Sequence, residues 1–176
     1  RVNGIPVTTA DIQTSNGVVH LIDGVLLEAT TVTERAILTP TFSTLADLVV
    51  QAGLDDDLNG SGPFTVLAPT NQAFLDALDA NDNGQIDGNE VPSQSQLESI
   101  LTYHVIAGQA VESSAISDGQ SVETLEGSDV TFGVSGGTIT VNPSAENATV
   151  AAPDVQVSNG IIHGIDTVLT PPSGSN

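Results

Sequence analysis

The chain has no cysteine, methionine or tryptophan, and it has only one tyrosine and four phenylalanines. Without cysteine, disulfides and thiol chemistry are excluded. The low aromatic content leaves valine, isoleucine, leucine and alanine to fill a core, and it supplies few stacking surfaces for a sugar. No run of residues approaches the roughly 20 apolar positions of a membrane-spanning helix. We therefore expect an aliphatic core and no membrane span.

Positive charge is also nearly absent. Arg1 and Arg35 stand against 22 aspartates and glutamates, which gives a formal net charge of −20. Such a surface repels nucleic acid and anionic lipid and attracts divalent cations. The remaining composition, with much Thr, Ser, Gly, Asn and Val, is typical of extracellular proteins. The sequence therefore predicts a secreted or cell-surface protein that binds no nucleic acid.

A segment near the start of the chain returns at its end. Residues 11–26 align with residues 154–169 at a constant offset of 143 (154 − 11), and ten of the sixteen positions are identical. That offset is one domain long. Residues 1–33 are interpreted as the tail of a preceding repeat or an assembly arm, with a linker from Glu28 to Glu34. Residues 34–172 are interpreted as the domain and 173–176 as a flexible tail. This organisation favours a structural or adhesive role.

Helical patterns are confined to the first half of the repeat, and strand patterns dominate the second half. Residues 41–53, the segment after Thr70 or Asn71 and the segment after Ser93 carry helical periodicity or capping signals. Short strand patterns separated by turns fill residues 121–166. This order predicts an α+β fold, with helices packed on an antiparallel sheet or sandwich.

Three motifs resemble signatures of the fasciclin (FAS1) domain family, in that family's order: residues 62–74, the Tyr103-His104 pair, and residues 159–169. The resemblance implies a β-sandwich with a layer of short helices, here preceded by an extended β segment that repeats the last motif. It also implies extracellular adhesion or matrix assembly, commonly through tandem copies. The family has no general catalytic residues, and the chain has no G-x-S-x-G or H-E-x-x-H pattern. We therefore expect that the protein is not an enzyme.

The Tyr103-His104 pair has two readings. The family resemblance suggests an adhesion element. From the residues themselves, a structural role is the simpler interpretation: both side chains are half-buried, and His104 is hydrogen-bonded to a polar group such as Thr70 or Asn71. His20 and His163 lie in equivalent strands of the repeat, and we expect both to be structural histidines too.

Residues 79–90 fit the calcium-loop pattern D-x-[DN]-x-[DN]-G-x5-E at every specified position. The spacing brings oxygen atoms around one cation, and Gly84 permits the sharp turn. The expected ligands are the side chains of Asp79, Asn81, Asn83, Asp87 and Glu90 and the backbone carbonyl of Gln85. Pro92 interrupts the exit helix, so we expect one stabilising Ca²⁺ rather than a paired sensor. The alternative is an acidic surface loop with Asn-Gly turns.

The repeated segment at the start carries apolar side chains that would be exposed if it stood alone: Val18, Val19, Leu21, Ile22, Val25 and Leu26. An exposed apolar strand invites pairing with another chain. We expect residues 2–27 to pack on another copy of the protein or another FAS1 domain, and a head-to-tail contact of this kind builds filaments when it does not close. The alternative is that the segment is an end left where the chain was cut.

A second function class is a binding module for a small hydrophobic ligand or a polysaccharide, including a matrix polysaccharide. It would need an apolar or aromatic-lined cleft. The low aromatic content argues against sugar stacking, whereas a cleft between the sheet and the helices would favour it.

Overall fold

The computed structural model describes residues 7–22, 30–141 and 147–172. The helices are α1 (Val32–Leu38), α2 (Ser43–Ala52), α3 (Asp55–Leu58), α4 (Asn71–Leu78) and α5 (Gln94–Tyr103), with 3-10 turns at Pro40–Phe42 and Ser113–Ala115. The strands are β1 (Val7–Thr14), β2 (Gly17–Ile22), β3 (Phe64–Pro69), β4 (Val105–Ala107), β5 (Ser121–Glu123), β6 (Asp129–Ser135), β7 (Thr138–Val141), β8 (Ala148–Val157) and β9 (Gly160–Ile165).

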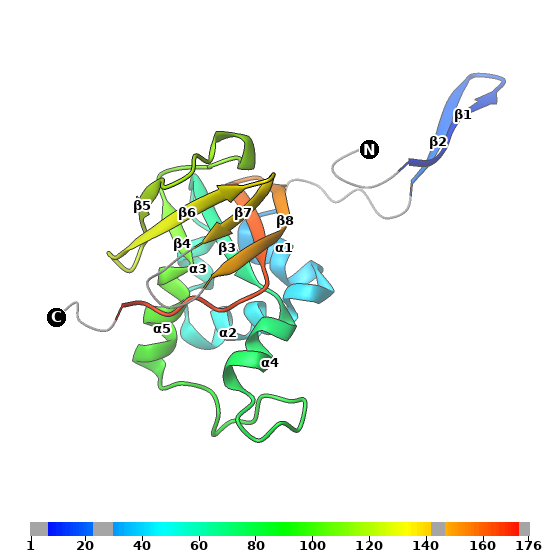
Figure 1. The fold of residues 1–176 in the computed structure, drawn as a ribbon. Coiled ribbons are helices and arrows are strands. Elements are labelled where there is room, and N and C mark those ends of the chain that lie inside the picture. Colours follow the sequence, from blue (N-terminus) through cyan, green and yellow to red (C-terminus); the bar gives the residue numbers. More distant parts are fainter. Residues whose placement is uncertain (1–6, 23–29, 142–146, 173–176) are drawn as a thin grey trace.

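Seven of these strands form one sheet in the order β4-β3-β9-β8-β7-β6-β5. Only the β3–β9 pair is parallel, and all the other neighbours are antiparallel. The sheet folds over on itself, because buried side chains of β3, β4 and β9 share one apolar cluster with side chains of β5, β6 and β7. The two halves therefore pack as a sandwich, and the expected α+β architecture is confirmed (Figure 1).

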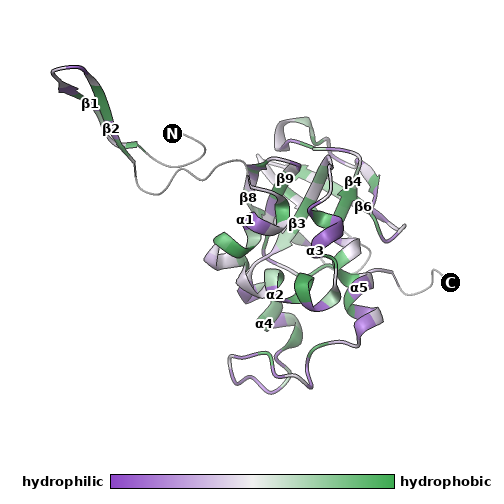
Figure 2. Ribbon diagram, turned by 180° about the vertical axis from the view of Figure 1, so that it is seen from behind, coloured by the Kyte–Doolittle hydropathy of each residue, from purple (hydrophilic) through white to green (hydrophobic). Residues whose placement is uncertain are grey.

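The helices form a layer over the other side of β3 and β9. Their apolar residues share a second cluster with Val66 of β3 and Ile162 of β9, and Figure 2 shows the helices gathered on one side of the strands. Burial of these side chains contributes roughly 25 cal/mol per Å² of apolar surface removed from water. The expected aliphatic core is confirmed, since mainly Leu, Val, Ile and Ala fill both clusters.

Local signals set the helix ends. The Thr70 hydroxyl accepts from the Ala73 amide at the start of α4. Ser93 and Gln96 form a capping box at the start of α5, and Gly53 ends α2 with a left-handed φ of 73°. Side-chain caps satisfy amides that the first helical turn leaves unpaired, and glycine adopts a positive φ without steric cost. These three ends agree with the sequence patterns.

Helix α1 was not predicted. The expected linker from Glu28 to Glu34 is wrong from Val32 onward, because Thr31 and Glu34 form a capping box and start α1 inside the threonine-rich run. Val32 and Thr33 are buried in the core. The packed domain therefore begins before residue 34.

The hairpin of β1 and β2 reproduces the hairpin of β8 and β9. Each of its five paired positions, from Val7↔Ile22 to Thr14↔Gly17, falls on a β8–β9 pair after adding 143 to both residue numbers. The bulges fall at the same places, and Asp11 and Asp154 both have positive φ, 58° and 60°. Figures 1 and 2 show β1–β2 standing away from the sandwich. The sequence repeat is therefore also a structural repeat.

The environments of the two hairpins differ. Strand β9 is buried along nearly its whole length, whereas Val18, Val19 and Leu21 of β2 are 48%, 48% and 56% exposed. The expectation that the first copy exposes its apolar side chains holds for these three residues. The Ile22 side chain and Val25 and Leu26 lie outside the described residues.

Candidate functional site

His104 lies at the end of α5, buried between the helical layer and the last segment of the domain. Its Nδ1 contacts the Ile100 carbonyl oxygen at 2.7 Å, and its Nε2 accepts from the Leu169 amide at 2.9 Å. The accepting Nε2 leaves Nδ1 as the donor of a neutral ring. The expected bond from His104 to Thr70 or Asn71 is wrong, since Thr70 caps α4 and Asn71 contacts Pro40, Ser43 and Thr44.

Tyr103 is buried beside it. Its hydroxyl donates to the Asp129 carbonyl at 3.1 Å. Burial raises the pKa of Tyr103, and the charges of Glu126 and Asp129 raise it further. Tyr103 and His104 are 0% and 1% exposed, not half-buried as expected. Neither side chain can touch a partner at the surface, so the pair has a structural role: it fixes α5 to β6 and to the C-terminal segment.

The buried imidazole makes stability depend on pH. Burial lowers the pKa of His104 from 6.5 to about 4, although its hydrogen bond to Ile100 works in the opposite direction. Between pH 6.5 and pH 4 the His104 imidazole is protonated in the unfolded chain but stays neutral in the folded chain. The free energy of unfolding therefore falls as the pH falls from 6.5 to 4. The loss is about 3 kcal/mol (6.5 − 4, at about 1.36 kcal/mol per pKa unit). Urea denaturation at several pH values measures it.

His104→Gln is the control for this effect, because the amide keeps a donor and an acceptor but does not titrate. The difference in unfolding free energy between the two proteins should change by about 3 kcal/mol across that pH range and stay constant below it. Parallel pH profiles for the two proteins would contradict the assignment.

His163 and Asp154 hold the loop that follows β4. His163 is buried, its Nδ1 accepts from the Asp154 amide at 3.2 Å, and its Nε2 donates to the Val111 carbonyl at 2.8 Å. The Asp154 carboxylate accepts from the amide of Ser113 at 2.8 Å and from its hydroxyl. Burial alone would raise the pKa of Asp154, but the hydrogen bonds from Ser113 outweigh it and lower the pKa. His163 is thus a structural histidine, as expected.

The same pair recurs in the first hairpin without its loop. His20 Nδ1 accepts from the Asp11 amide at 3.1 Å, but the side chains of His20 and Asp11 are 48% and 79% exposed. His20 therefore accepts the same backbone hydrogen bond as His163 but, unlike His163, it is exposed.

The calcium-like loop connects α4 to α5, and its carboxylates accept hydrogen bonds from the loop's own amides. Both carboxylate oxygens of Asp79 accept from backbone amides, those of Asn83 at 3.1 Å and Gly84 at 2.7 Å. The Glu90 oxygens accept from the amides of Asn81 at 3.2 Å and Asp87 at 2.9 Å. Gly84 has a φ of 79°, which glycine adopts readily. These hydrogen bonds tie the first and last positions of the pattern to backbone amides inside the loop.

Asp87 contacts two further residues of the pattern. Its Oδ2 accepts from the amide nitrogens of Asn81 at 3.1 Å and Asn83 at 2.9 Å. Turning each of these two side-chain amides by 180° would place its oxygen, in place of its nitrogen, beside the Asp87 carboxylate. In the described part of the chain, no three His, Cys, Asp or Glu side chains form a metal cluster. The carboxylates of Asp79, Asp87 and Glu90 are therefore not gathered around one point, and each accepts hydrogen bonds from amides of the loop. The donor set of oxygens suits Ca²⁺, which prefers carboxylates, amides and carbonyls.

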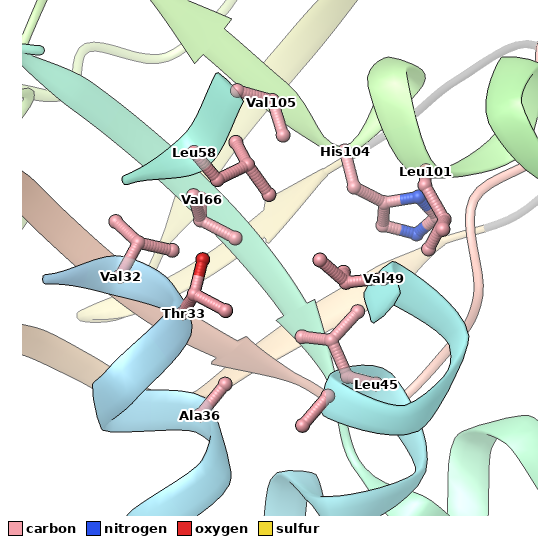
Figure 3. A pocket seen from close by; sticks show the side chains of 11 residues that line it. Val32, Thr33, Ala36, Leu45, Val49, Leu58, Val66, Leu101, His104 and Val105 are labelled. Atoms are coloured by element: carbon pink, nitrogen blue, oxygen red, sulfur yellow. The ribbon is translucent and has the colours of Figure 1, made fainter. Parts of the chain in front are cut away.

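A small cavity lies where α1, α2, α3, α5, β3 and β4 meet. It is lined by Val32, Thr33, Ala36, Leu45, Ala46, Val49, Leu58, Val66, Leu101, His104 and Val105. The centre of a water molecule could occupy a volume of about 20 Å³ in this cavity, which is room for roughly one water. Figure 3 shows the Thr33 hydroxyl facing Val66 and Leu58, with the His104 ring on the far wall.

The Thr33 hydroxyl is the polar group without a partner in this cavity. Thr33 is 4% exposed, and among the described residues its Oγ1 has no hydrogen bond. A water there would find too few polar neighbours, because it needs two to four. We expect Thr33→Val to stabilise the protein by about 1–2 kcal/mol, since it removes an unpaired buried hydroxyl and keeps the side-chain shape. Chemical denaturation measures the change.

Thr65→Val is the matched control. Thr65 is equally buried, but its hydroxyl donates to Gln109 and accepts from the Val111 amide. Thr65→Val leaves the Gln109 carbonyl and the Val111 amide without this partner, and it should lower the free energy of unfolding by about 1–3 kcal/mol. Equal effects of the two substitutions would show that the Thr33 hydroxyl is not unpaired.

Comparison with known proteins places this chain in a family. The sequence model of the fasciclin domain matches residues 1–28 and 40–171. "Protein sll1483" from Synechocystis sp. is 39% identical over 171 residues, covering 96% of this chain and 89% of that protein. "Transforming growth factor-beta-induced protein ig-h3" from Sus scrofa is 37% identical over 173 residues, covering 98% of this chain but 24% of that protein. The chain belongs to the fasciclin (FAS1) domain family.

A solved structure shows the same fold. It is a FAS1 domain pair from the insect cell adhesion molecule Fasciclin I, with a TM-score of 0.74 and 24% identity, covering 95% of this chain and 60% of that chain. The predicted family and fold are therefore confirmed. The chain spans most of the Synechocystis protein and about a quarter of ig-h3.

Two residues at the β8–β9 turn were not singled out as site residues from the sequence. The buried Asn159 side chain accepts from the Val32 amide at 3.0 Å and donates to the carbonyls of Leu58 at 2.8 Å and Gly60 at 2.9 Å. At Gly160, a Cβ atom would lie 2.1 Å from the Phe64 carbonyl oxygen. Their recurrence as Asn16 and Gly17 in the repeat was the signal that could have found them.

Proposed function

We propose that this protein is an extracellular, calcium-binding adhesion or structural module that joins other FAS1 domains, in tandem or head to tail, within a surface or matrix fibre. The observation that carries the proposal is the hairpin of β1 and β2. It has the register of the β8–β9 hairpin, whose strand β9 is buried in the domain, yet its Val18, Val19 and Leu21 are exposed. An exposed strand pair of this kind gains free energy by docking on another protein.

Calcium is the second part of the proposal. The loop from Asp79 to Glu90 is anchored to the core by partly buried Ile86 and Val91. A cation held there would tie the end of α4 to the start of α5, and it would offset part of the repulsion within a chain of net charge −20. In this proposal the ion stabilises the module and carries out no reaction.

The location and partners follow from the relatives and the charge. One structural relative comes from a cell adhesion molecule, and a strongly acidic surface repels nucleic acid. No helix in the described ranges is long and apolar enough to cross a membrane. Other FAS1 domains and other copies of this protein are the partners we propose. Catalysis is not proposed, because His104 and His163 are buried with both ring nitrogens engaged.

A small hydrophobic ligand is the second candidate function. The apolar cavity around Thr33 favours it, since its lining is aliphatic except for Thr33 and His104, and the unpaired Thr33 hydroxyl could orient a polar end. The space is too small for more than a water-sized group, so a larger ligand would have to open α1 away from α2. A matrix polysaccharide is favoured by no comparable feature.

Light scattering on the full chain tests the main proposal. We expect larger particles in calcium than in EDTA, and smaller particles again when Val19 and Leu21 are both replaced by threonine. Threonine keeps the strand propensity and removes the apolar surface. A particle of one-chain mass in both solutions would contradict self-association.

A further inference from the structure

The closing hairpin of the domain is held by contacts on both sides. Strand β3 runs parallel to β9, with Phe64 opposite Gly160, and β7 pairs with β8. The turn is fixed by Asn159, which bonds to residues 32, 58 and 60. Asp154 and His163 bind residues 113 and 111 of a crossing loop. These contacts define the slot that a β8–β9 hairpin occupies.

The hairpin of β1 and β2 keeps the residues that make these contacts. Asp11, Asn16, Gly17 and His20 correspond to Asp154, Asn159, Gly160 and His163 at the offset of 143. No protein atom lies within 4 Å of the Cβ position of Gly17, and its φ is not positive. Neither local strain nor local crowding therefore explains a glycine at that position. A glycine at a strand end often marks the close approach of another backbone.

We propose that the β1–β2 hairpin is the closing hairpin of a second FAS1 body, which receives it in the slot that β8–β9 fills here. This rests on the proposed function, and it names the partner surface: a β3-type strand beside Gly17 and a loop that binds Asp11 and His20. Matching of residues 1–28 to the fasciclin domain, separately from residues 40–171, supports it.

A closed copy of this chain is not the acceptor. Within the seven-stranded sheet, β3 is already flanked by β4 and β9, so only the edges of β4 and β5 are free for pairing. Contact between closed copies at these edges and docking in the slot are therefore different events. The acceptor is a FAS1 body whose slot is open.

The shape of the slot limits which FAS1 bodies can accept the β1–β2 hairpin. In this domain Gly164 faces the Phe42 ring, and a Cβ there would lie 3.0 Å from the ring and 3.1 Å from the Ala152 Cβ. The hairpin has Leu21 at the equivalent position. Overpacking of this kind opposes binding. The acceptor therefore has a smaller side chain than phenylalanine at the position of Phe42.

A refolding competition tests this assignment. A protease site is placed within residues 142–146 of the full-length chain, and the folded protein is cleaved there, so that the tail carrying β8–β9 is held without a covalent link. The cleaved protein is denatured and refolded with an equal amount of a synthetic peptide of residues 2–27. Mass spectrometry of the purified body gives the ratio of bound peptide to bound tail. Incubation without denaturation gives a second ranking of the same peptides.

The Leu21→Gly peptide should occupy the body about tenfold more than the wild-type peptide, and Phe42→Ala in the body should remove that difference. Adding Asp11→Ala or His20→Ala to the Leu21→Gly peptide should lower its occupancy about tenfold, because each loses a polar contact to the loop. Thr8→Ala, which matches the residue at position 151, should change nothing.

Absence of every peptide from the body, or equal occupancy with and without the Asp11 and His20 substitutions, would overturn the proposal. Neither calcium nor self-association enters this experiment. Its failure is therefore distinguishable from a failure of the proposed function.

Discussion

Gly160→Ala is expected to unfold the domain or to cost more than about 4 kcal/mol, a large share of the roughly 5–15 kcal/mol that stabilise a typical domain. The added Cβ would lie 2.1 Å from the carbonyl oxygen and 2.8 Å from the carbonyl carbon of Phe64. Both are backbone atoms of β3, so no rotamer change can relieve the clash. The parallel β3–β9 pair would have to separate, and it lies between the two apolar clusters. Urea denaturation followed by circular dichroism measures the loss.

Gly17→Ala is the matched substitution, at the same position of the other hairpin. Nothing lies within 4 Å of its Cβ position. We expect a change of less than about 1 kcal/mol, which includes the small gain from a less flexible unfolded chain. A Gly160→Ala protein as stable as the wild type would show that β3 does not pass this close to the turn.

Calcium should raise the unfolding free energy of the wild-type protein by roughly 3 kcal/mol at a hundredfold excess over its dissociation constant. Two of the five side-chain ligands are neutral amides, so we expect weak binding, about 10⁻⁴–10⁻³ M, as in extracellular modules. Glu90→Gln should abolish most of the gain, because it removes the charge of the residue that would close the ligand shell. Isothermal titration calorimetry and denaturation with and without calcium measure both effects.

Asp82→Asn is the control within the same loop. It changes the charge by the same amount, but Asp82 stands at the fourth position, which supplies no ligand in the pattern. Its φ of 55° is one that asparagine tolerates. The variant should retain nearly the full calcium effect. If Glu90→Gln and Asp82→Asn gained as much as the wild type, the stabilisation would come from general charge screening and not from this loop.

Calcium binding and assembly remain predictions, because they concern what the chain binds.

The fold could be predicted from the sequence because the signals that set its helices are local. Thr70, Ser93 with Gln96, and Gly53 set helix ends through contacts within a few residues. Helix α1 was missed although Thr31 and Glu34 carried the same signal, because threonine-rich composition resembles a linker.

The sequence by itself determined the family, the α+β class and the repeated hairpin, since each depends on residues close together in the chain or on a direct match between two segments. Only the tertiary structure decided that His104 bonds to Leu169, that Gly160 is required by Phe64, and that Gly164 lies against the Phe42 ring. These contacts join residues far apart in sequence, and they are set by how sheet and helices pack, which residue spacing does not encode.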